Sequence, residues 1–104
     1  MDYRGEDRRG EPRIPYVTEA FVEHTRRASD RISDLSANGA FIETMNGLPV
    51  GSRFTFSFHL PEAEIRVSAE VRYNMAQIGT GVRFLDLSDE ARSSIDGLVR
   101  ERTS

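Results

Sequence analysis

The chain has 104 residues, enough for one domain, and its 38% hydrophobic and 30% charged residues argue against both disorder and a membrane protein. The formal net charge is −3, which argues against a basic coat for non-specific binding of nucleic acids. There is no cysteine, so disulfides, thiolate metal ligands and a cysteine nucleophile are excluded.

Residues 1–15 are polar, contain glycine and proline, and carry arginines at positions 4, 8, 9 and 13. We expect them to form a mobile arm that leads into the first strand, where Pro15 favours an extended entry. The arm is charged throughout, unlike a signal peptide, and no apolar run approaches the roughly 20 residues that cross a bilayer. The sequence therefore predicts a cytoplasmic protein without membrane insertion.

The arm contains an Arg-x-x-x-Arg pattern, formed by Arg9 and Arg13, and Arg8 directly precedes it. Arg4 and Arg8 make a second match, five residues further from the predicted strand. All 14 basic residues of the chain are arginines, whose guanidinium groups are rigid forks of donors suited to phosphate or a guanine edge. The alternative is a solvated charged tail, because acidic residues alternate with these arginines.

Residues 16–86 are predicted to form about six short strands. Phe54–Leu60 and Ile65–Tyr73 alternate apolar and polar residues, as half-buried strands do, and Pro61–Glu64 supplies a turn that makes them a hairpin. Because no helix separates the strands, we expect a small antiparallel barrel. The remaining strands are expected around Val17–Val22, Ile32–Leu35, Ala40–Ile42 and Val82–Phe84.

A predicted helix at residues 88–102 completes the domain, which is expected to span residues 16–104. Ser88 can cap the first turn, where Asp89 and Glu90 suit the positive end of the helix dipole. An apolar stripe follows at helical spacing, formed by Ala91, Ile95, Leu98 and Val99. We expect this stripe to pack either across the barrel or against a second copy of the chain.

Residues suited to catalysis are sparse. His24 and His59 lie on predicted strands without a partner at ligand spacing, so ordinary solvent-facing positions are favoured over catalysis or metal ligation. The acid pair Glu62 and Glu64 lies in a predicted turn. No Gly-rich phosphate loop, nucleophile elbow or zinc motif occurs. The sequence therefore predicts no enzyme, no catalytic residue, no metal site and no cofactor.

A second motif, Asp-x-Ser-x-x-Gly, runs from Asp34 to Gly39 at the junction of two predicted strands. Asp34 and Ser36 are two residues apart, so they point to the same face of an extended strand. The Asp34 carboxylate could accept N–H groups of guanine, and Gly39 could hold a positive φ and let a ligand approach the backbone. The alternative is an ordinary hairpin turn, in which these side chains satisfy local amides.

The two motifs, in this order and this far apart, resemble those of the PilZ family, small bacterial receptors for the second messenger cyclic di-GMP. The resemblance covers nearly the whole chain and includes residues 81–88, GVRFLDLS. It implies an all-β fold, a six-stranded antiparallel β-barrel with a C-terminal helix. It also implies that cyclic di-GMP is bound by six residues: Arg8, Arg9, Arg13, Asp34, Ser36 and Gly39.

The implied ligand has two phosphates and two guanines, whose O6 and N7 acceptors suit arginine. We expect the arm to clamp cyclic di-GMP, as one molecule or as an intercalated dimer, against the surface of residues 34–39. The ordered arm would then signal to a separate protein partner. A domain of this size without an output module must act on such a partner or belong to a longer protein.

Two other functions compete with this interpretation. The first is a PilZ-like adaptor that binds a protein and no nucleotide, although such members usually lack one of the two motifs. The second is a small barrel that binds single-stranded nucleic acid, which would need exposed aromatic residues between basic ones. The phenylalanines here alternate as core residues do, so we expect no DNA or RNA partner.

Overall fold

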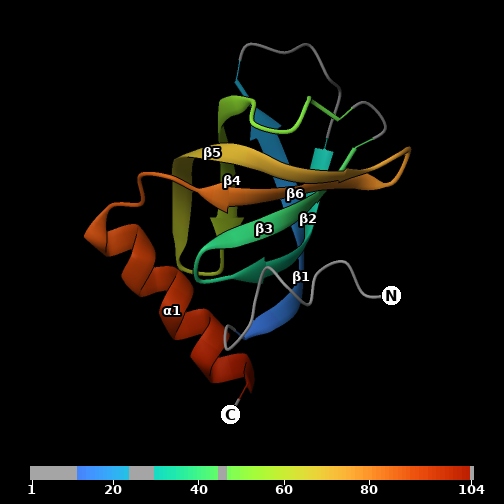
Figure 1. Ribbon diagram of the computed structural model, residues 1–104. Coiled ribbons are helices and arrows are strands. Elements are labelled where there is room, and N and C mark those ends of the chain that lie inside the picture. The colour runs from blue at the N-terminus through green and yellow to red at the C-terminus, as the bar shows by residue number, and fades with distance from the viewer. Residues whose placement is uncertain (1–11, 24–29, 45–46, 104) are drawn as a thin grey trace.

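A computed structural model describes residues 12–23, 30–44 and 47–103 of the chain (Figure 1). In this part of the chain, the strands close an antiparallel barrel in the order β1-β2-β3-β6-β5-β4, and one helix follows. The predicted six-stranded barrel with a C-terminal helix is therefore confirmed. The elements are β1 (Arg13–Val22), β2 (Asp30–Ser36), β3 (Gly39–Glu43), β4 (Arg53–Leu60), β5 (Ala63–Met75), β6 (Gly79–Phe84) and α1 (Asp89–Thr103).

The hairpin of β4 and β5 supplies much of the core, as its alternating pattern predicts. The rings of Phe56 and Phe58 are fully buried and stack with centroids 5.5 Å apart. The turn is shorter than expected, because Leu60 pairs with Ala63 and residue 64 pairs with residue 59. Pro61 and Glu62 alone make the connection, as is usual for two-residue loops that follow the twist of the strands.

Strand β1 has a regular burial pattern, although its apolar residues are spaced irregularly in the sequence. A register shift between Pro15 and Thr18 interrupts its pairing with β2. The shift leaves the alternation of burial along β1 intact: Ile14 and Ala20 are buried on the inner face, whereas Val17 and Phe21 on the outer face are 66% and 48% exposed. Two of the three apolar residues that indicated this strand, Val17 and Phe21, thus lie on its outer face, whereas Val22 packs against the core.

The expected boundary between arm and barrel, after Pro15, falls inside β1. The strand begins at Arg13, which pairs with Ser36 of β2, and Ile14 is buried in the core. Residues 13–15 therefore belong to the barrel, because Ile14 contributes apolar area to the core. The rest of the expected arm, residues 1–11, lies outside the described part of the chain.

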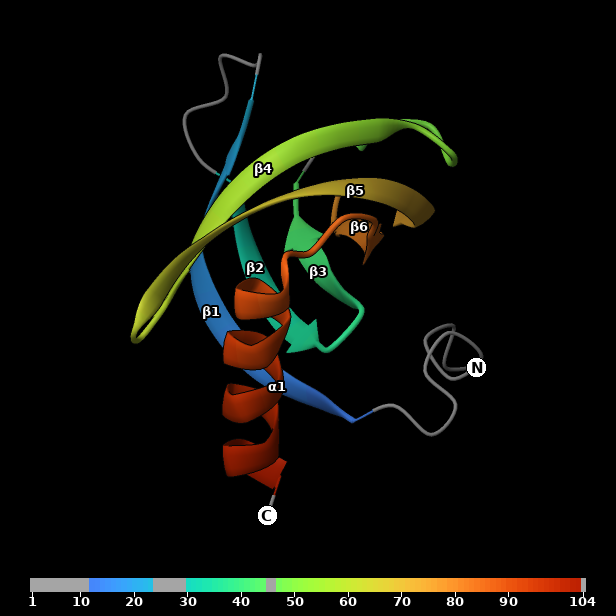
Figure 2. The ribbon, with the colours of Figure 1, turned by 90° about the vertical axis from the view of Figure 1, so that its left-hand side faces the viewer.

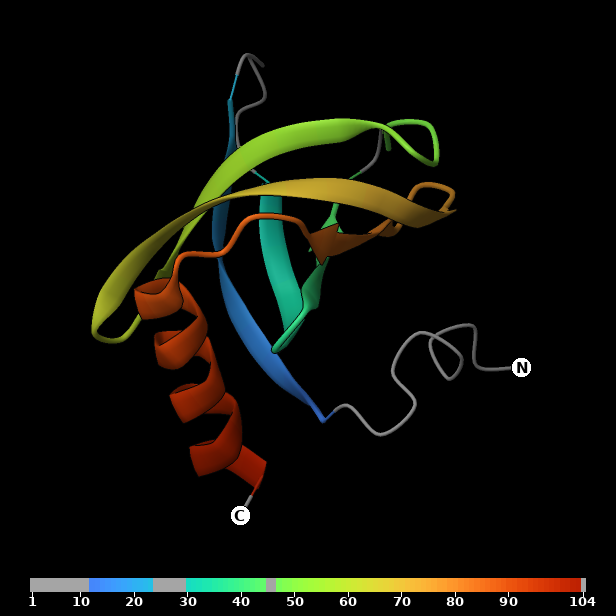
Figure 3. The ribbon, with the colours of Figure 1, turned by 60° about the vertical axis from the view of Figure 1, so that its left-hand side comes forward.

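Helix α1 lies along one end of the barrel, beside β1 (Figures 2 and 3). Its buried residues Ile95, Leu98 and Val99 join the same core cluster as the strands, so the apolar stripe packs on the barrel of its own chain. Ser88 caps the helix as predicted: the Ala91 N–H donates to its Oγ at 3.0 Å, and the helix proper begins one residue later.

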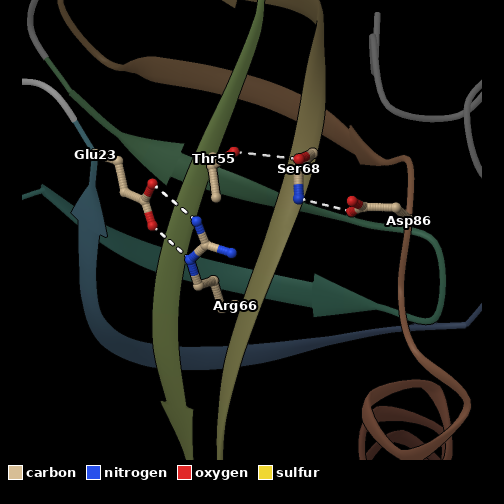
Figure 4. A network of polar contacts seen from close by, with 5 residues as sticks. All are labelled: Glu23, Thr55, Arg66, Ser68 and Asp86. Carbon is tan, nitrogen blue, oxygen red and sulfur yellow. Dashed lines mark hydrogen bonds and ion pairs between the residues drawn. The ribbon is translucent and has the colours of Figure 1, made fainter.

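Polar contacts cross the outer face of β4 and β5 (Figure 4). Arg66 donates from Nε and Nη2 to the two Glu23 carboxylate oxygens, at 2.6 and 3.1 Å, and this hydrogen bonding raises the pKa of the Arg66 guanidinium. Thr55 and Ser68 share a hydroxyl hydrogen bond of 3.1 Å. The Ser68 N–H donates to Asp86 Oδ1 at 2.8 Å, which ties the segment between β6 and α1 to the barrel wall.

We predict that Ser88→Ala lowers the free energy of unfolding by about 1 kcal/mol, because an N–H of the first turn loses its acceptor. Chemical denaturation followed by circular dichroism measures this change. Ser93→Ala on the exposed face of the same helix is the matched control and should leave stability unchanged or slightly raised, since alanine favours helix. Equal midpoints for Ser88→Ala and the parent protein would contradict the assigned cap.

Candidate ligand-binding site

The two sequence motifs meet at an ion pair. Arg13, the first residue of β1, donates from Nη1 to Asp34 Oδ1 of β2 at 2.8 Å. Both side chains are largely buried, with 13% and 10% of their surface exposed. The pairing of β1 with β2 creates this contact, because Pro15 lies opposite Asp34 and Arg13 opposite Ser36. The Asp34 carboxylate, which was expected to accept N–H groups of guanine, thus already accepts a hydrogen bond from Arg13 through one of its oxygens.

Ser36 and Gly39 form the tight connection from β2 to β3. The buried Ser36 hydroxyl donates to the Gly39 carbonyl oxygen at 3.2 Å, a local contact of the kind that the hairpin interpretation expects. The expected positive φ of Gly39 is wrong, since the positive φ values of the described residues occur at Gly51 and Gln77. Gly39 is needed for another reason: a Cβ there would overlap the carbonyl oxygen of Val82 on β6.

A groove of about 540 Å³ opens beside this connection. This volume falls within the range of small-molecule sites, roughly 300–1,000 Å³. Arg13 and Gly39 line it, together with residues of β5, β6 and α1 that include three further arginines. We call it the arginine groove and define it by Arg13, Gly39, Arg72, Tyr73, Arg83 and Arg92.

The electrostatics of the arginine groove favour an anion. Asp34 neutralises Arg13 in part, but no carboxylate in the described ranges pairs with the guanidinium of Arg72, Arg83 or Arg92. The buried Nε of Arg13 has no acceptor within the described residues. A buried donor without a partner carries a desolvation cost, which an incoming acceptor or water would relieve.

Comparison with known proteins decides the family. The model of the PilZ domain matches residues 7–101. The chain belongs to the PilZ domain family. No curated protein sequence matches it.

Solved structures share the PilZ fold with this chain. The Bacillus subtilis inhibitor of motility MotI/DgrA is 18% identical to this chain and superposes on 92% of it with a TM-score of 0.79. The match covers 51% of MotI/DgrA, so this chain spans about half the length of that protein. The PilZ domain of CeSA from a cellulose-synthesizing bacterium is 18% identical, with a TM-score of 0.61 over 88% of this chain and 98% of its own. An uncharacterized Legionella protein is 19% identical, with a TM-score of 0.56 over 88% of this chain and 94% of its own.

The fold brings together four of the six predicted site residues: Arg13, Asp34, Ser36 and Gly39. Arg13 and Gly39 line the arginine groove, whereas Asp34 and Ser36 are buried and make internal contacts. The other two, Arg8 and Arg9, lie outside the described part of the chain. Sequence reasoning missed the arginines that β5, β6 and α1 contribute, although Arg83 belongs to the GVRFLDLS stretch that supported the family resemblance.

The structure also places the residues considered for catalysis or metal binding. His59 is exposed on β4, where its ring meets Phe21 edge-on with centroids 6.5 Å apart, and His24 lies outside the described residues. Within the described ranges, no group of three or more His, Asp or Glu side chains is placed to hold a metal ion.

No helix in the described part of the chain is both long and apolar enough to span a membrane.

We predict that Asp34→Asn lowers the free energy of unfolding by about 3 kcal/mol, the lower end of the cost of breaking a buried ion pair, because Arg13 keeps its charge in a largely buried place. Thermal and chemical denaturation measure the change.

The matched control is Glu43→Gln, which breaks the exposed pair between Arg31 Nε and Glu43 Oε1 at 2.8 Å, with 61% and 38% of the side chains exposed. This control should cost less than about 1 kcal/mol. If the two variants lose equal stability, the Arg13–Asp34 pair does not hold β1 to β2 as described.

Proposed function

We propose that this PilZ domain is a cytoplasmic receptor for cyclic di-GMP that passes the signal to a separate protein partner. The observation that carries the proposal is the meeting of its two motifs: Arg13 and Gly39 line one groove, and Arg13 is held there by Asp34. The family to which the chain belongs consists of cyclic di-GMP receptors and adaptors, and the groove supplies the cationic surface that a dinucleotide requires.

Arg13 is the proposed primary contact. Its guanidinium can donate to a phosphate, or to O6 and N7 of a guanine in bidentate fashion. Asp34 then acts chiefly as a positioning residue, because its largely buried carboxylate orients Arg13 toward the groove. A direct contact between Asp34 and guanine N–H groups would need acceptor positions of the carboxylate other than the one that Arg13 Nη1 occupies.

The arm supplies the remaining contacts in this proposal. Arg9 precedes Arg13 by four residues, and four residues of extended chain span at most about 14 Å. The guanidinium of Arg9 can therefore reach a ligand in the groove. Arg8 is its direct neighbour and shares that reach. Ordering of the arm over the ligand would change the outer surface beside β1 and so present a new contact to the partner.

The second candidate is an adaptor that binds a protein and no nucleotide. It is favoured by the ion pair between Arg13 and Asp34, because these two charges already neutralise each other in the absence of a ligand. The Bacillus subtilis protein that shares the fold is named an inhibitor of motility, a role that either candidate could serve. A receptor for single-stranded nucleic acid has less support, because Phe56 and Phe58 are buried and cannot stack on bases.

We predict that calorimetric titration of the parent protein with cyclic di-GMP gives a saturable heat, and that Arg9→Ala weakens the affinity by about tenfold to more than a hundredfold. The reason is that a hydrogen bond to a charged group contributes roughly 1.5–3 kcal/mol. Arg9 is preferred to Arg13 for this test, because removing Arg13 would also leave Asp34 without its buried ion-pair partner.

Arg31→Ala is the control, since Arg31 is exposed on β2 and does not line the groove. Its affinity should stay within about twofold of the parent, as removal of a distant surface charge changes binding little in screened solution. Absence of heat with the parent protein would favour the adaptor. Equal affinities of Arg9→Ala and the parent would contradict the clamp formed by the arm.

A further inference from the structure

Three arginines outside both sequence motifs line the arginine groove. Arg72 comes from β5, Arg83 from β6 and Arg92 from α1. All three are exposed, and none forms an ion pair or hydrogen bond through its side chain with a described residue. Glu70 lies opposite Arg83 in the strand pairing, but no salt bridge joins them. Three like charges are thus gathered on one concave surface, and no carboxylate of the described residues is in direct contact with them. Their mutual repulsion costs free energy that a bound anion would offset.

Arg72 lies at an irregularity in the pairing of β5 with β6. Val71 pairs with Val82, and Tyr73 pairs with Gly81, so Arg72 lies at a register shift with no partner of its own on β6. Such irregularities re-aim side chains and are common beside binding sites. A Cβ at Gly81 would overlap the Tyr73 ring, so the glycine allows this ring to lie against β6 where both residues line the groove.

The position of Arg92 in α1 is unfavourable for the helix alone. The Arg92 N–H donates to the Ser88 carbonyl oxygen at 2.9 Å, which places Arg92 at the end of the first turn of the helix. A cation there opposes the helix dipole, whose positive end suits Asp89 and Glu90. A ligand anion beside Arg92 would offset this cost.

We propose that Arg72, Arg83 and Arg92 form a second anion-binding wall of the arginine groove, which takes a phosphate while Arg13 holds another part of the same ligand. This inference rests on the proposed function and deepens it: the ligand class is a nucleotide with at least two phosphates. Arginine suits such a site because its planar fork grips phosphate oxygens in pairs. Since the wall spans three elements, the bound phosphate ties the start of α1 to β5 and β6.

The test is a titration of the triple variant R72Q/R83Q/R92Q with cyclic di-GMP at several salt concentrations. We expect its affinity to fall about thirtyfold or more relative to the parent, and its dependence on salt to become weaker, since three charged contacts are lost. Hydrogen exchange supplies a second readout: the ligand should slow exchange at the start of α1 in the parent protein but not in the triple variant.

The matched control is R31Q/R66Q/R100Q, which removes the same charge from β2, β5 and α1 at exposed residues that do not line the groove. It should bind within about threefold of the parent, because only screened long-range attraction is reduced. Thermal unfolding without ligand confirms that both triple variants are folded.

The outcomes separate this inference from the proposed function. If the parent binds cyclic di-GMP and the groove variant matches the control, the second wall is wrong and the receptor function stands. If the parent binds inorganic pyrophosphate but not cyclic di-GMP, and the groove variant loses this binding, the wall stands and the proposed ligand is wrong. If the parent binds neither probe, both are wrong.

Discussion

The pairing of β3 with β6 is the constraint on which the site depends. These strands are separated in the chain by the long β4–β5 hairpin, yet Gly39 lies opposite Arg83 and Ala40 opposite Val82. The contact closes the barrel and places the end of the second motif beside residues of β6 and β5. It needs a residue without a side chain at position 39, because the Val82 carbonyl occupies the space of a Cβ. One glycine therefore serves barrel closure and the shape of the arginine groove together.

Charge around the groove is arranged in two ways. Arg13 is held by Asp34 in a largely buried ion pair, which fixes the direction of one guanidinium at the cost of desolvating both groups. Arg72, Arg83 and Arg92 are instead exposed and lack carboxylate partners within the described chain. This combination gives one preorganised donor and three adaptable ones, an arrangement suited to a ligand that carries several anionic or acceptor groups. The formal net charge of −3 does not reveal this local surface, because it sums charge over the whole chain and does not show which arginines gather at one groove.

Much of the fold could be predicted because burial leaves a direct pattern in sequence. The alternation in β4 and β5 and the stripe on α1 correspond to side chains that enter the core, including Phe56, Phe58 and Ile95. The exact turn between β4 and β5 could not be predicted, because loop geometry decides it. The outward direction of Val17 could not be predicted either, because the inner face of β1 carries Tyr16, Thr18 and Ala20, which are no more apolar than the outer-face residues Val17 and Phe21.

The candidate site was predictable to the extent that it lies within contiguous motifs. The approach of Arg13 to Asp34 followed from recognising both motifs together, although their direct ion pair did not. The sequence predicted that Gly39 is needed for a positive φ. It is needed instead because β3 packs closely against Val82 of β6, which is more than 40 residues further along the chain. Arg72, Arg83 and Arg92 are scattered over β5, β6 and α1, so only the closed barrel shows that they share one surface.

A crystal structure of the protein with cyclic di-GMP would show directly where the ligand binds. We predict the dinucleotide in the arginine groove, with Arg13 donating to a phosphate or a guanine edge and a second phosphate within hydrogen-bond distance of Arg72, Arg83 or Arg92. A ligand bound on another face of the barrel, with this groove filled by solvent, would contradict it.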